Sequence, residues 1–218
     1  MRNDISLHVF TNATASAPDT QLIERTYGSF CETFGNDIAV TVWCDPKPNT
    51  EQGAAYITKL NGLFDRVNET QSLSDGFVRA VNTATTAYLF MLEHDWQFLP
   101  TIRHGLTEIM AAMEAQDLLH LRFNKRANVA KKSDRALQPV DYPAMPYCTT
   151  GFLSNNPHII HRERYIKRAL QWITVREKTY GIEKDLSQGH LQGAIYGPAG
   201  YPATVEHLDG KAYKIHTL

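Results

Sequence analysis

The segment Tyr88-Leu-Phe-Met-Leu-Glu-His-Asp-Trp96 is the most informative stretch of this sequence. An apolar run, Tyr88 to Leu92, precedes two carboxylates, Glu93 and Asp95. A short, wholly apolar run is typical of a strand buried in the middle of an α/β sheet. Residues two apart in an extended backbone project to the same side. The segment therefore predicts a buried strand that ends in two acids on one face.

Alternating strand and helix patterns lead up to this segment. The expected elements are strands at 5–10 and 38–44, and helices at 19–34, at 51–64 and after Ser74. Strands that alternate with helices on this scale predict a mostly parallel central sheet with helices on both faces. Ligands of such sheets bind beyond the carboxyl ends of the strands. Thr11, Asp45 and the pair Glu93 and Asp95 all stand at such ends, which predicts one site there.

The pattern becomes less regular after Asp95. The expected elements are helices at 101–115 and 162–178 and strands at 118–123 and 149–154. A long irregular stretch at 124–147 separates two of these elements, and loops of this length are usually functional lids or disordered. The last thirty or so residues are expected to be irregular.

Composition indicates one globular domain over residues 1–218. The chain has 218 residues, of which 43% are hydrophobic and 21% charged, enough to bury a real core. Its 22 Lys and Arg residues balance 23 Asp and Glu residues, for a net charge of −1. A chain without cationic excess is a poor candidate for a dedicated binder of nucleic acid or of anionic membranes.

No membrane span or disulfide framework is indicated. The longest apolar run, Ala87 to Leu92, has six residues, whereas a membrane-spanning helix needs about 20. The first residues lack the apolar stretch of a signal peptide. Three cysteines, odd in number and widely spaced, fit neither a disulfide framework nor a zinc site. We therefore expect a reduced, cytoplasmic protein.

Glu93 and Asp95 are candidate metal ligands. Carboxylate oxygens suit Mg²⁺ and Mn²⁺, and Mg²⁺ commonly combines one or two protein carboxylates with substrate phosphates. On this tripeptide alone, an ordinary polar turn after a strand is an equally good interpretation.

The segment from Ser74 to Asp95 resembles the GT-A class of glycosyltransferases, which use nucleotide-sugar donors on a Rossmann-like sheet. In that pattern a Gly, an Arg and an Asn on a helix precede an apolar strand that ends in a D-x-D-type metal motif. Gly76, Arg79 and Asn82 match the helix positions, and Glu93-His94-Asp95 matches the metal motif. Glu93 departs from the pattern because Asp is usual there, so Asp95 is the stronger candidate for direct metal binding.

Two earlier strand ends match the same class. The resemblance implies that Thr11 and Asp45 embrace the base and ribose of the donor, and that Arg79 and Asn82 also contribute to nucleotide binding. A carboxylate can accept a hydrogen bond from a pyrimidine N–H, and a hydroxyl or backbone group can meet the other edge. The alternative is that Asp45 opens a turn before Pro46.

In metal-dependent GT-A enzymes, a histidine from a loop late in the chain often coordinates the cation. His207, in the segment Thr204-Val-Glu-His-Leu-Asp-Gly210, is similar to that histidine, and His216 is a competing candidate. A neutral imidazole ligand would favour Mn²⁺ over Mg²⁺. A lone histidine in an irregular tail is otherwise a surface or packing residue.

The segments Gly151 to Arg164 and Tyr180 to Asp185 resemble the acceptor half of these enzymes. There a carboxylate at the start of a helix deprotonates the acceptor hydroxyl, which requires an ionised group within hydrogen-bond reach. Glu183 and Asp185 are the candidates, Glu183 ranking first, although Lys184 separates acids that are often adjacent. Alternatively, both carboxylates only stabilise the N-terminus of the helix.

Basic and aromatic residues near the metal motif each have a functional and a structural interpretation. Arg79 and the residues Lys125, Arg126, Lys131 and Lys132 are candidates for neutralising a departing nucleoside diphosphate. For the lysines, a solvated surface loop is the default interpretation. Trp96 either stacks on a sugar or fills the core, which is commoner.

The resemblance implies a Rossmann-like GT-A fold with a nucleotide-sugar-binding half at 1–100 and an acceptor-binding half at 101–218. The expected function is transfer of a sugar from a UDP-, dTDP- or GDP-sugar to a hydroxyl acceptor such as a glycan, aided by Mn²⁺ or Mg²⁺. A single displacement would invert the anomeric centre, and a retaining route stays open. A nucleotidyltransferase or a non-catalytic sugar- or nucleotide-binding module are the alternatives; the first strand end lacks the glycine-rich loop usual in nucleotidyltransferases.

Overall fold

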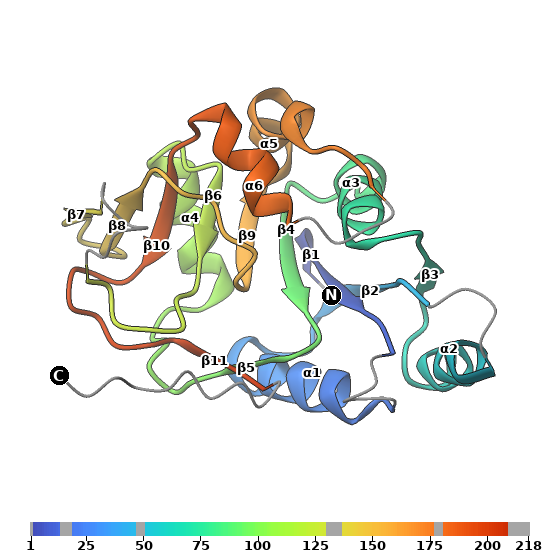
Figure 1. Cartoon of the computed structure of the whole chain (residues 1–218). Helices are drawn as coiled ribbons and strands as arrows, with labels where there is room; N and C mark the ends of the chain where they lie inside the picture. The colour runs from blue at the N-terminus through green and yellow to red at the C-terminus, as the bar shows by residue number, and fades with distance from the viewer. Residues whose placement is uncertain (1, 14–18, 47–50, 130–136, 177–180, 209–218) are drawn as a thin grey trace, which may run out of the picture.

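A computed structural model of the chain describes residues 2–13, 19–46, 51–129, 137–176 and 181–208. A central sheet runs through the molecule with helices on either side (Figure 1). Its strands are β1 (Arg2–Thr11), β2 (Ile38–Cys44), β3 (Val67–Glu69), β4 (Tyr88–Glu93), β6 (His120–Arg122), β7 (Gln138–Val140), β8 (Tyr147–Thr150), β9 (His158–His161) and β10 (Gly193–Tyr196). The α-helices are α1 (Gln21–Phe34), α2 (Glu51–Leu63), α3 (Leu73–Thr83), α4 (Leu106–Ala115), α5 (Arg162–Arg168) and α6 (Ile182–Leu186).

The strand order is β3-β2-β1-β4-β9-β6-β10-β8-β7. Strands β3, β2, β1 and β4 are parallel, as the alternating pattern of the first hundred residues predicts. In the second half the sheet is mixed, because β9 is antiparallel to both β4 and β6, whereas β10 is parallel to β6. The predicted α/β fold, with a Rossmann-like parallel half, is confirmed.

The two faces of the sheet bury separate hydrophobic cores. Along β4, Tyr88, Phe90 and Leu92 belong to the core that α1, α2 and α4 cover. Leu89 and Met91 belong to the core under α3, α5 and α6, which lie together on the other face (Figure 1). The period-two alternation of a strand produces this division. Glu93 continues the second set and therefore faces the side of α3 and α6.

A two-stranded sheet completes the fold beside α1. Strand β5 (Trp96–Phe98) pairs antiparallel with β11 (Val205–His207), and His207 lies opposite Trp96. The backbone N–H of Thr204 donates to the carbonyl of Asn124, and the Asn124 N–H donates to the Thr204 hydroxyl. These bonds attach the late segment to the chain that follows β6.

Several boundaries differ from the sequence expectations. The helix expected at 162–178 ends at Arg168, followed by a 3-10 turn at Leu170–Trp172, and the Thr174 N–H donates to the Asp185 carboxylate instead of a helical carbonyl. Strands β3, β5, β7, β9, β10 and β11 are too short for the alternation of their residues to stand out. Among the described residues, no helix is long and apolar enough to cross a membrane.

Candidate functional site

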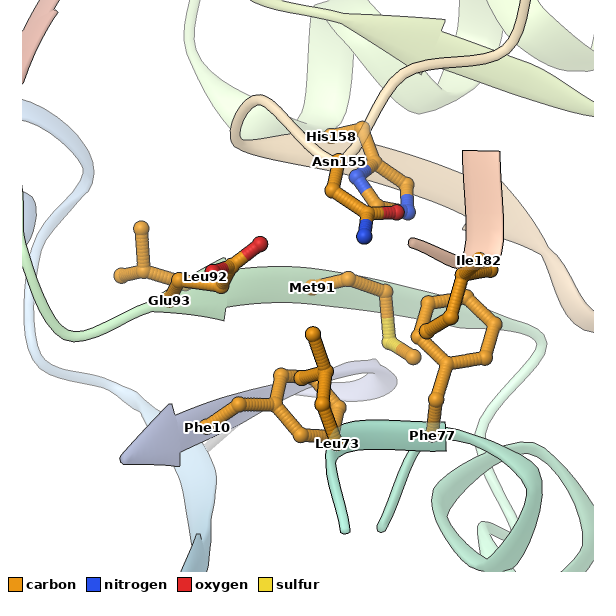
Figure 2. A pocket seen from close by; sticks show the side chains of 9 residues that line it. All are labelled: Phe10, Leu73, Phe77, Met91, Leu92, Glu93, Asn155, His158 and Ile182. Carbon is orange, nitrogen blue, oxygen red and sulfur yellow. The ribbon is translucent and has the colours of Figure 1, made fainter. Parts of the chain in front are cut away.

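Two adjoining pockets lie at the carboxyl ends of β1 and β4. The strand-end pocket is lined by Phe10, Thr11, Asn12, Trp43, Asp45, Thr70, Leu73, Glu93 and His94. The inner pocket is smaller and is lined by Phe10, Leu73, Phe77, Met91, Leu92, Glu93, Asn155, His158 and Ile182 (Figure 2). Phe10, Leu73 and Glu93 line both. The parallel strands therefore bring Thr11, Asp45 and Glu93 to one edge of the sheet, as predicted.

Thr11 and Asp45 stand at neighbouring strand ends. The Asp45 N–H donates to the Thr11 carbonyl over 2.9 Å. The Thr11 hydroxyl is hydrogen bonded to the Tyr56 hydroxyl, and the Thr11 side chain is buried. Burial and the nearby charge of Asp75 raise the pKa of the Asp45 carboxyl above its usual value. A carboxylate held in this way gains from any ligand that donates a hydrogen bond to it.

Helix α3 supports the wall of the strand-end pocket. A Cβ atom on Gly76 would lie 3.3 Å from Thr70 and Trp43 and 3.4 Å from Phe10, so the glycine permits this close approach. Arg79 donates to the Glu69 carbonyl over 2.7 Å, and its guanidinium carbon lies 5.4 Å from the centre of the Trp43 ring. Arg79 thus borders the pocket through Trp43 and does not line it.

Asn82 does not reach the site. It lies nine residues beyond Leu73 on the same helix, so the helical rise separates the two by about 13 Å. Its side chain is exposed, and its carbonyl accepts a hydrogen bond from Arg162 at the opposite edge of the sheet. The nucleotide-binding role expected for Asn82 is therefore not supported, because α3 runs away from the pocket.

Glu93 and Asp95 separate at a turn. Residues His94 and Asp95 form the turn between β4 and β5, so the extended alternation that would place both acids on one face ends at Glu93. The His94 N–H donates to the Phe10 carbonyl, and the Thr26 hydroxyl donates to the His94 carbonyl. With its backbone fixed on both sides, the turn directs Glu93 into the pockets and Asp95 toward β11.

Asp95 and His207 form a close pair. Oδ2 of Asp95 lies 3.2 Å from Nε2 of His207, and the Leu208 N–H donates to the Asp95 carbonyl over 2.7 Å. The His207 ring packs edge-on against Trp96, with 4.6 Å between ring centres. Oδ1 of Asp95 is buried and has no hydrogen-bond partner within the described part of the chain.

The Asp95–His207 pair fits a divalent cation. Two ligand atoms on adjacent positions of an octahedral cation, each about 2.1 Å from it, are about 3.0 Å apart, close to the 3.2 Å between these atoms. The buried Oδ1 offers a further acceptor. Across the described ranges no group of three or more His, Cys, Asp or Glu side chains is placed to hold a metal ion together. A cation here would therefore complete its shell with ligand oxygens and water.

Two other acids, Asp95 and Glu183, affect the pKa of Glu93. Burial, together with the charges of Asp95 and Glu183, raises the pKa of Glu93 to about 8, although Lys125 opposes the shift. The Lys125 ammonium lies 5.6 Å from the centre of the Trp96 ring. Lys125 therefore supplies positive charge at this edge of the sheet, while Trp96 is a buried packing residue. Lys131, Lys132 and His216 lie outside the described residues.

The two candidate bases have different surroundings. Oε1 of Glu183 accepts hydrogen bonds from the Ser154 hydroxyl and the Asn155 N–H, each over 2.7 Å. Asn155 lines the inner pocket, so this places Glu183 beside it. Asp185 is 3% exposed, and its carboxylate accepts from Arg176 and from the Thr174 N–H. Asp185 thus holds a loop together and is not placed to take a proton from a substrate, contrary to expectation.

Other lining residues were not singled out from the sequence. Trp43 and Thr70 line the strand-end pocket, and Asn155 and His158 line the inner pocket. Asn155 and His158 belong to the stretch that resembles an acceptor region, but a strand as short as β9 gives no sequence signal for the direction of its side chains.

Solved structures share this architecture. The crystal structure of GalNAc-T7 with UDP, GalNAc and Mn²⁺ matches with a TM-score of 0.59 at 10% identity, over 93% of this chain and 43% of that chain. The crystal structure of S. aureus TarS 1–349 matches with a TM-score of 0.55 at 12% identity, over 94% of this chain and 60% of that chain. Both are glycosyltransferases with a GT-A fold. This chain has a GT-A fold.

The likeness is one of fold, since the identities are low. The chain spans less than two thirds of each of these solved chains, and 36% of a longer TarS structure that it matches with a TM-score of 0.52. No protein-family model and no curated protein matches the sequence. Within this GT-A fold, the pockets and the Asp95–His207 pair occupy the carboxyl edge of the parallel strands, where ligands of open α/β sheets bind.

Proposed function

We propose that this protein is a metal-dependent glycosyltransferase that moves a sugar from a nucleotide-sugar to a hydroxyl acceptor such as a glycan. The Asp95–His207 pair carries the proposal, because it places a carboxylate and an imidazole 3.2 Å apart next to a pocket at the strand ends. The architecture supports it, since the GT-A folds it resembles include a structure crystallised with UDP and Mn²⁺.

The strand-end pocket would hold the nucleoside. Asp45 can accept a hydrogen bond from a base N–H, and the backbone around Thr11 and Asn12 can meet other polar edges of the nucleoside. Trp43 contributes a flat apolar surface to the same wall, and Arg79 places positive charge over that ring. A uridine, thymidine or guanosine diphosphate fits these groups, with UDP the first to test.

Asp95 and His207 would hold Mn²⁺ or Mg²⁺, with Mn²⁺ favoured by the imidazole ligand. Such a cation neutralises the diphosphate charge that grows as the glycosidic bond breaks. Glu93 lies beside the pair and contributes to both pockets. Lys125 adds positive charge that would also favour departure of the nucleoside diphosphate.

Glu183 would act as the general base. The Ser154 hydroxyl and the Asn155 N–H both donate to its Oε1, which orients the carboxylate at the border of the inner pocket. The carboxylate would take the proton from the acceptor hydroxyl as the oxygen attacks the anomeric carbon. The bond to the nucleoside diphosphate breaks as the new one forms, so a single displacement inverts the anomeric centre.

A donor-hydrolysis and binding assay tests the proposal. The protein is incubated with UDP-, dTDP- and GDP-sugars in Mn²⁺ or in EDTA, and release of nucleoside diphosphate is followed. The affinities for UDP, dTDP and GDP are measured by calorimetry under the same two conditions. Mn²⁺-dependent UDP binding with release from at least one donor supports a glycosyltransferase. Metal-independent sugar binding without turnover would instead identify a binding module. Absence of Mn²⁺-dependent binding of all three nucleoside diphosphates would overturn the proposal.

A further inference from the structure

His158 is a buried polar residue at the inner pocket. Its side chain is 2% exposed and projects from β9 next to Met91 of β4. The imidazole stacks on His120, with 4.3 Å between ring centres, and faces Phe77 at 6.0 Å. The ring is therefore clamped in one orientation.

Its hydrogen bond to the backbone determines which nitrogen carries the proton. Nδ1 of His158 lies 2.8 Å from the Asn156 carbonyl oxygen. A carbonyl only accepts, so Nδ1 carries the hydrogen and donates it. Burial lowers the pKa of His158 to about 4, so the imidazole is neutral near pH 7. Nε2 is therefore a bare acceptor.

That acceptor lacks a hydrogen-bond partner in the described part of the chain. Nε2 of His158 is buried and has no hydrogen-bond partner within the described ranges. Buried polar side-chain atoms are bonded in the large majority of cases, so each exception calls for an explanation. A ligand that donates a hydrogen bond into the pocket provides one.

The rest of the inner pocket limits what that ligand is. Figure 2 shows Asn155 and His158 on one wall, the Glu93 carboxyl beside them, and the apolar side chains of Phe77 and Met91 across the pocket. None of the described residues that line the pocket carries a fixed positive charge, which disfavours a phosphate or carboxylate. A neutral group that both donates and accepts, next to apolar carbon, fits these walls.

We propose that the inner pocket receives a sugar hydroxyl, which donates a hydrogen bond to Nε2 of His158. This inference rests on the proposed function, because the inner pocket shares Phe10, Leu73 and Glu93 with the strand-end pocket and borders the loop that binds Glu183. It makes His158 a specificity-determining residue. A sugar that lacks this hydroxyl leaves the acceptor unpaired and is bound more weakly.

The variant His158→Phe tests this role. Phenylalanine keeps a flat ring between His120 and Phe77 but removes the acceptor. In Mn²⁺, we expect it to weaken binding of the preferred UDP-hexose about five- to tenfold, as for loss of one neutral hydrogen bond, and to leave UDP affinity unchanged. The matched control is His120→Phe, which changes the other ring of the stack and should leave both affinities unchanged, because His120 does not line the pocket.

A second titration separates the two sources of the hydroxyl. Methyl hexosides are added to protein already saturated with UDP and Mn²⁺. Loss of affinity for UDP-hexose alone in His158→Phe assigns the hydroxyl to the donor, and loss for methyl hexoside alone assigns it to the acceptor. If His158→Phe and the wild type bind every sugar with equal affinity, the inference is overturned. This holds even where UDP binding supports the proposed nucleotide site.

Imidazole resonances of the wild-type protein provide a test that does not depend on folding of a variant. In protein with ¹⁵N-labelled histidine, we expect the unprotonated Nε2 of His158 to shift when a UDP-hexose or a methyl hexoside is added, and not when UDP is added. A resonance unmoved by every sugar overturns the inference whether or not UDP binds. A protonated Nε2 near pH 7 overturns it as well.

Discussion

Nε2 of His207 lies 3.2 Å from Oδ2 of Asp95, although the two residues come from separate halves of the chain. The pairing of β5 with β11 creates this contact, because it sets His207 opposite Trp96, the residue after Asp95. The bond from the Leu208 N–H to the Asp95 carbonyl extends the pairing by one step. The proposed cation site is thus a product of sheet register, and a slip of one residue would turn His207 to the other face.

The Asp95→Asn variant should lose metal-dependent nucleotide binding. An amide is a weaker ligand than a carboxylate, so we expect Mn²⁺-dependent UDP affinity to fall at least about tenfold in calorimetry. Without metal, the variant should be as stable as the wild type or more so, because it removes a carboxylate whose buried Oδ1 has no hydrogen-bond partner in the described chain. Unchanged Mn²⁺–UDP affinity would contradict the role of Asp95. Asp65→Asn, an exposed change, is the control.

His207→Ala should lower the UDP affinity measured in Mn²⁺ more than the UDP affinity measured in Mg²⁺. Because the imidazole ligand favours Mn²⁺, its loss should bring the two UDP affinities closer together. Glu206→Gln changes the neighbouring exposed residue on β11 and should leave both affinities unaltered. Equal loss in the two metals would show that His207 acts only by packing on Trp96.

Glu183→Gln should separate binding from turnover. The glutamine carbonyl can still accept from Ser154 and the Asn155 N–H, so local structure is retained while the base is lost. We expect sugar transfer to drop at least about 100-fold with UDP affinity unchanged. Normal turnover in this variant would remove Glu183 from the mechanism.

Asp185→Asn should instead reduce stability. The change weakens the charged contact with Arg176 and retains only part of the acceptor capacity toward Thr174. We expect the free energy of unfolding, measured in urea, to fall by about 1–3 kcal/mol, because hydrogen bonds that involve charged groups contribute about this much. Per folded molecule, turnover should stay near that of the wild type. A turnover loss like that of Glu183→Gln, at full stability, would restore Asp185 as a candidate base.

Acid should destabilise the protein through buried histidines. Burial lowers the pKa of His8 to about 4, and its Nδ1 accepts a hydrogen bond from Trp43, so protonation there would break that bond. The unfolded chain, with a histidine pKa of about 6.5, binds more protons below that pH, and stability falls as the pH decreases from about 6.5 to 4. His8 alone contributes about 3 kcal/mol to this fall.

Urea unfolding at several pH values measures the effect. His8→Phe should flatten the pH dependence of the unfolding free energy between 6.5 and 4, whereas His190→Ala, an exposed change, should not. A pH dependence identical in wild type and His8→Phe would rule out the contribution of His8. Because Trp43 lines the strand-end pocket, UDP affinity of the folded protein should decline only as the pH approaches 4, where folded His8 takes up a proton.

The first half of the fold was predictable because its elements are long. Strand β4 and helix α3 carry enough apolar residues for period and boundaries to be evident, so Thr11, Asp45 and Glu93 could be placed at one edge. The pairing of His207 with Asp95 followed from the family resemblance, since a three-residue strand such as β11 has no recognisable period.

Sequence reasoning missed features that depend on the direction of side chains and on contacts between residues far apart in the chain. The turn at His94 separates Glu93 from Asp95, and only its bonds to Phe10 and Thr26 reveal this. The sequence left Asp185 as a candidate general base, ranked after Glu183, and its bond to Arg176 could not be read from the sequence. The stacking of His158 on His120 requires β6 and β9 to be neighbours, which no local pattern indicates.

The ring of Phe10 has a consequence for how such a protein could diversify. It belongs to the walls of both pockets and lies near Gly76 of α3. A smaller side chain at this position would widen both pockets at a wall that they share, without changing any acid or histidine of the site. New substrates could then be admitted by exchanging a single aromatic side chain, while the chemistry nearby stays as it is.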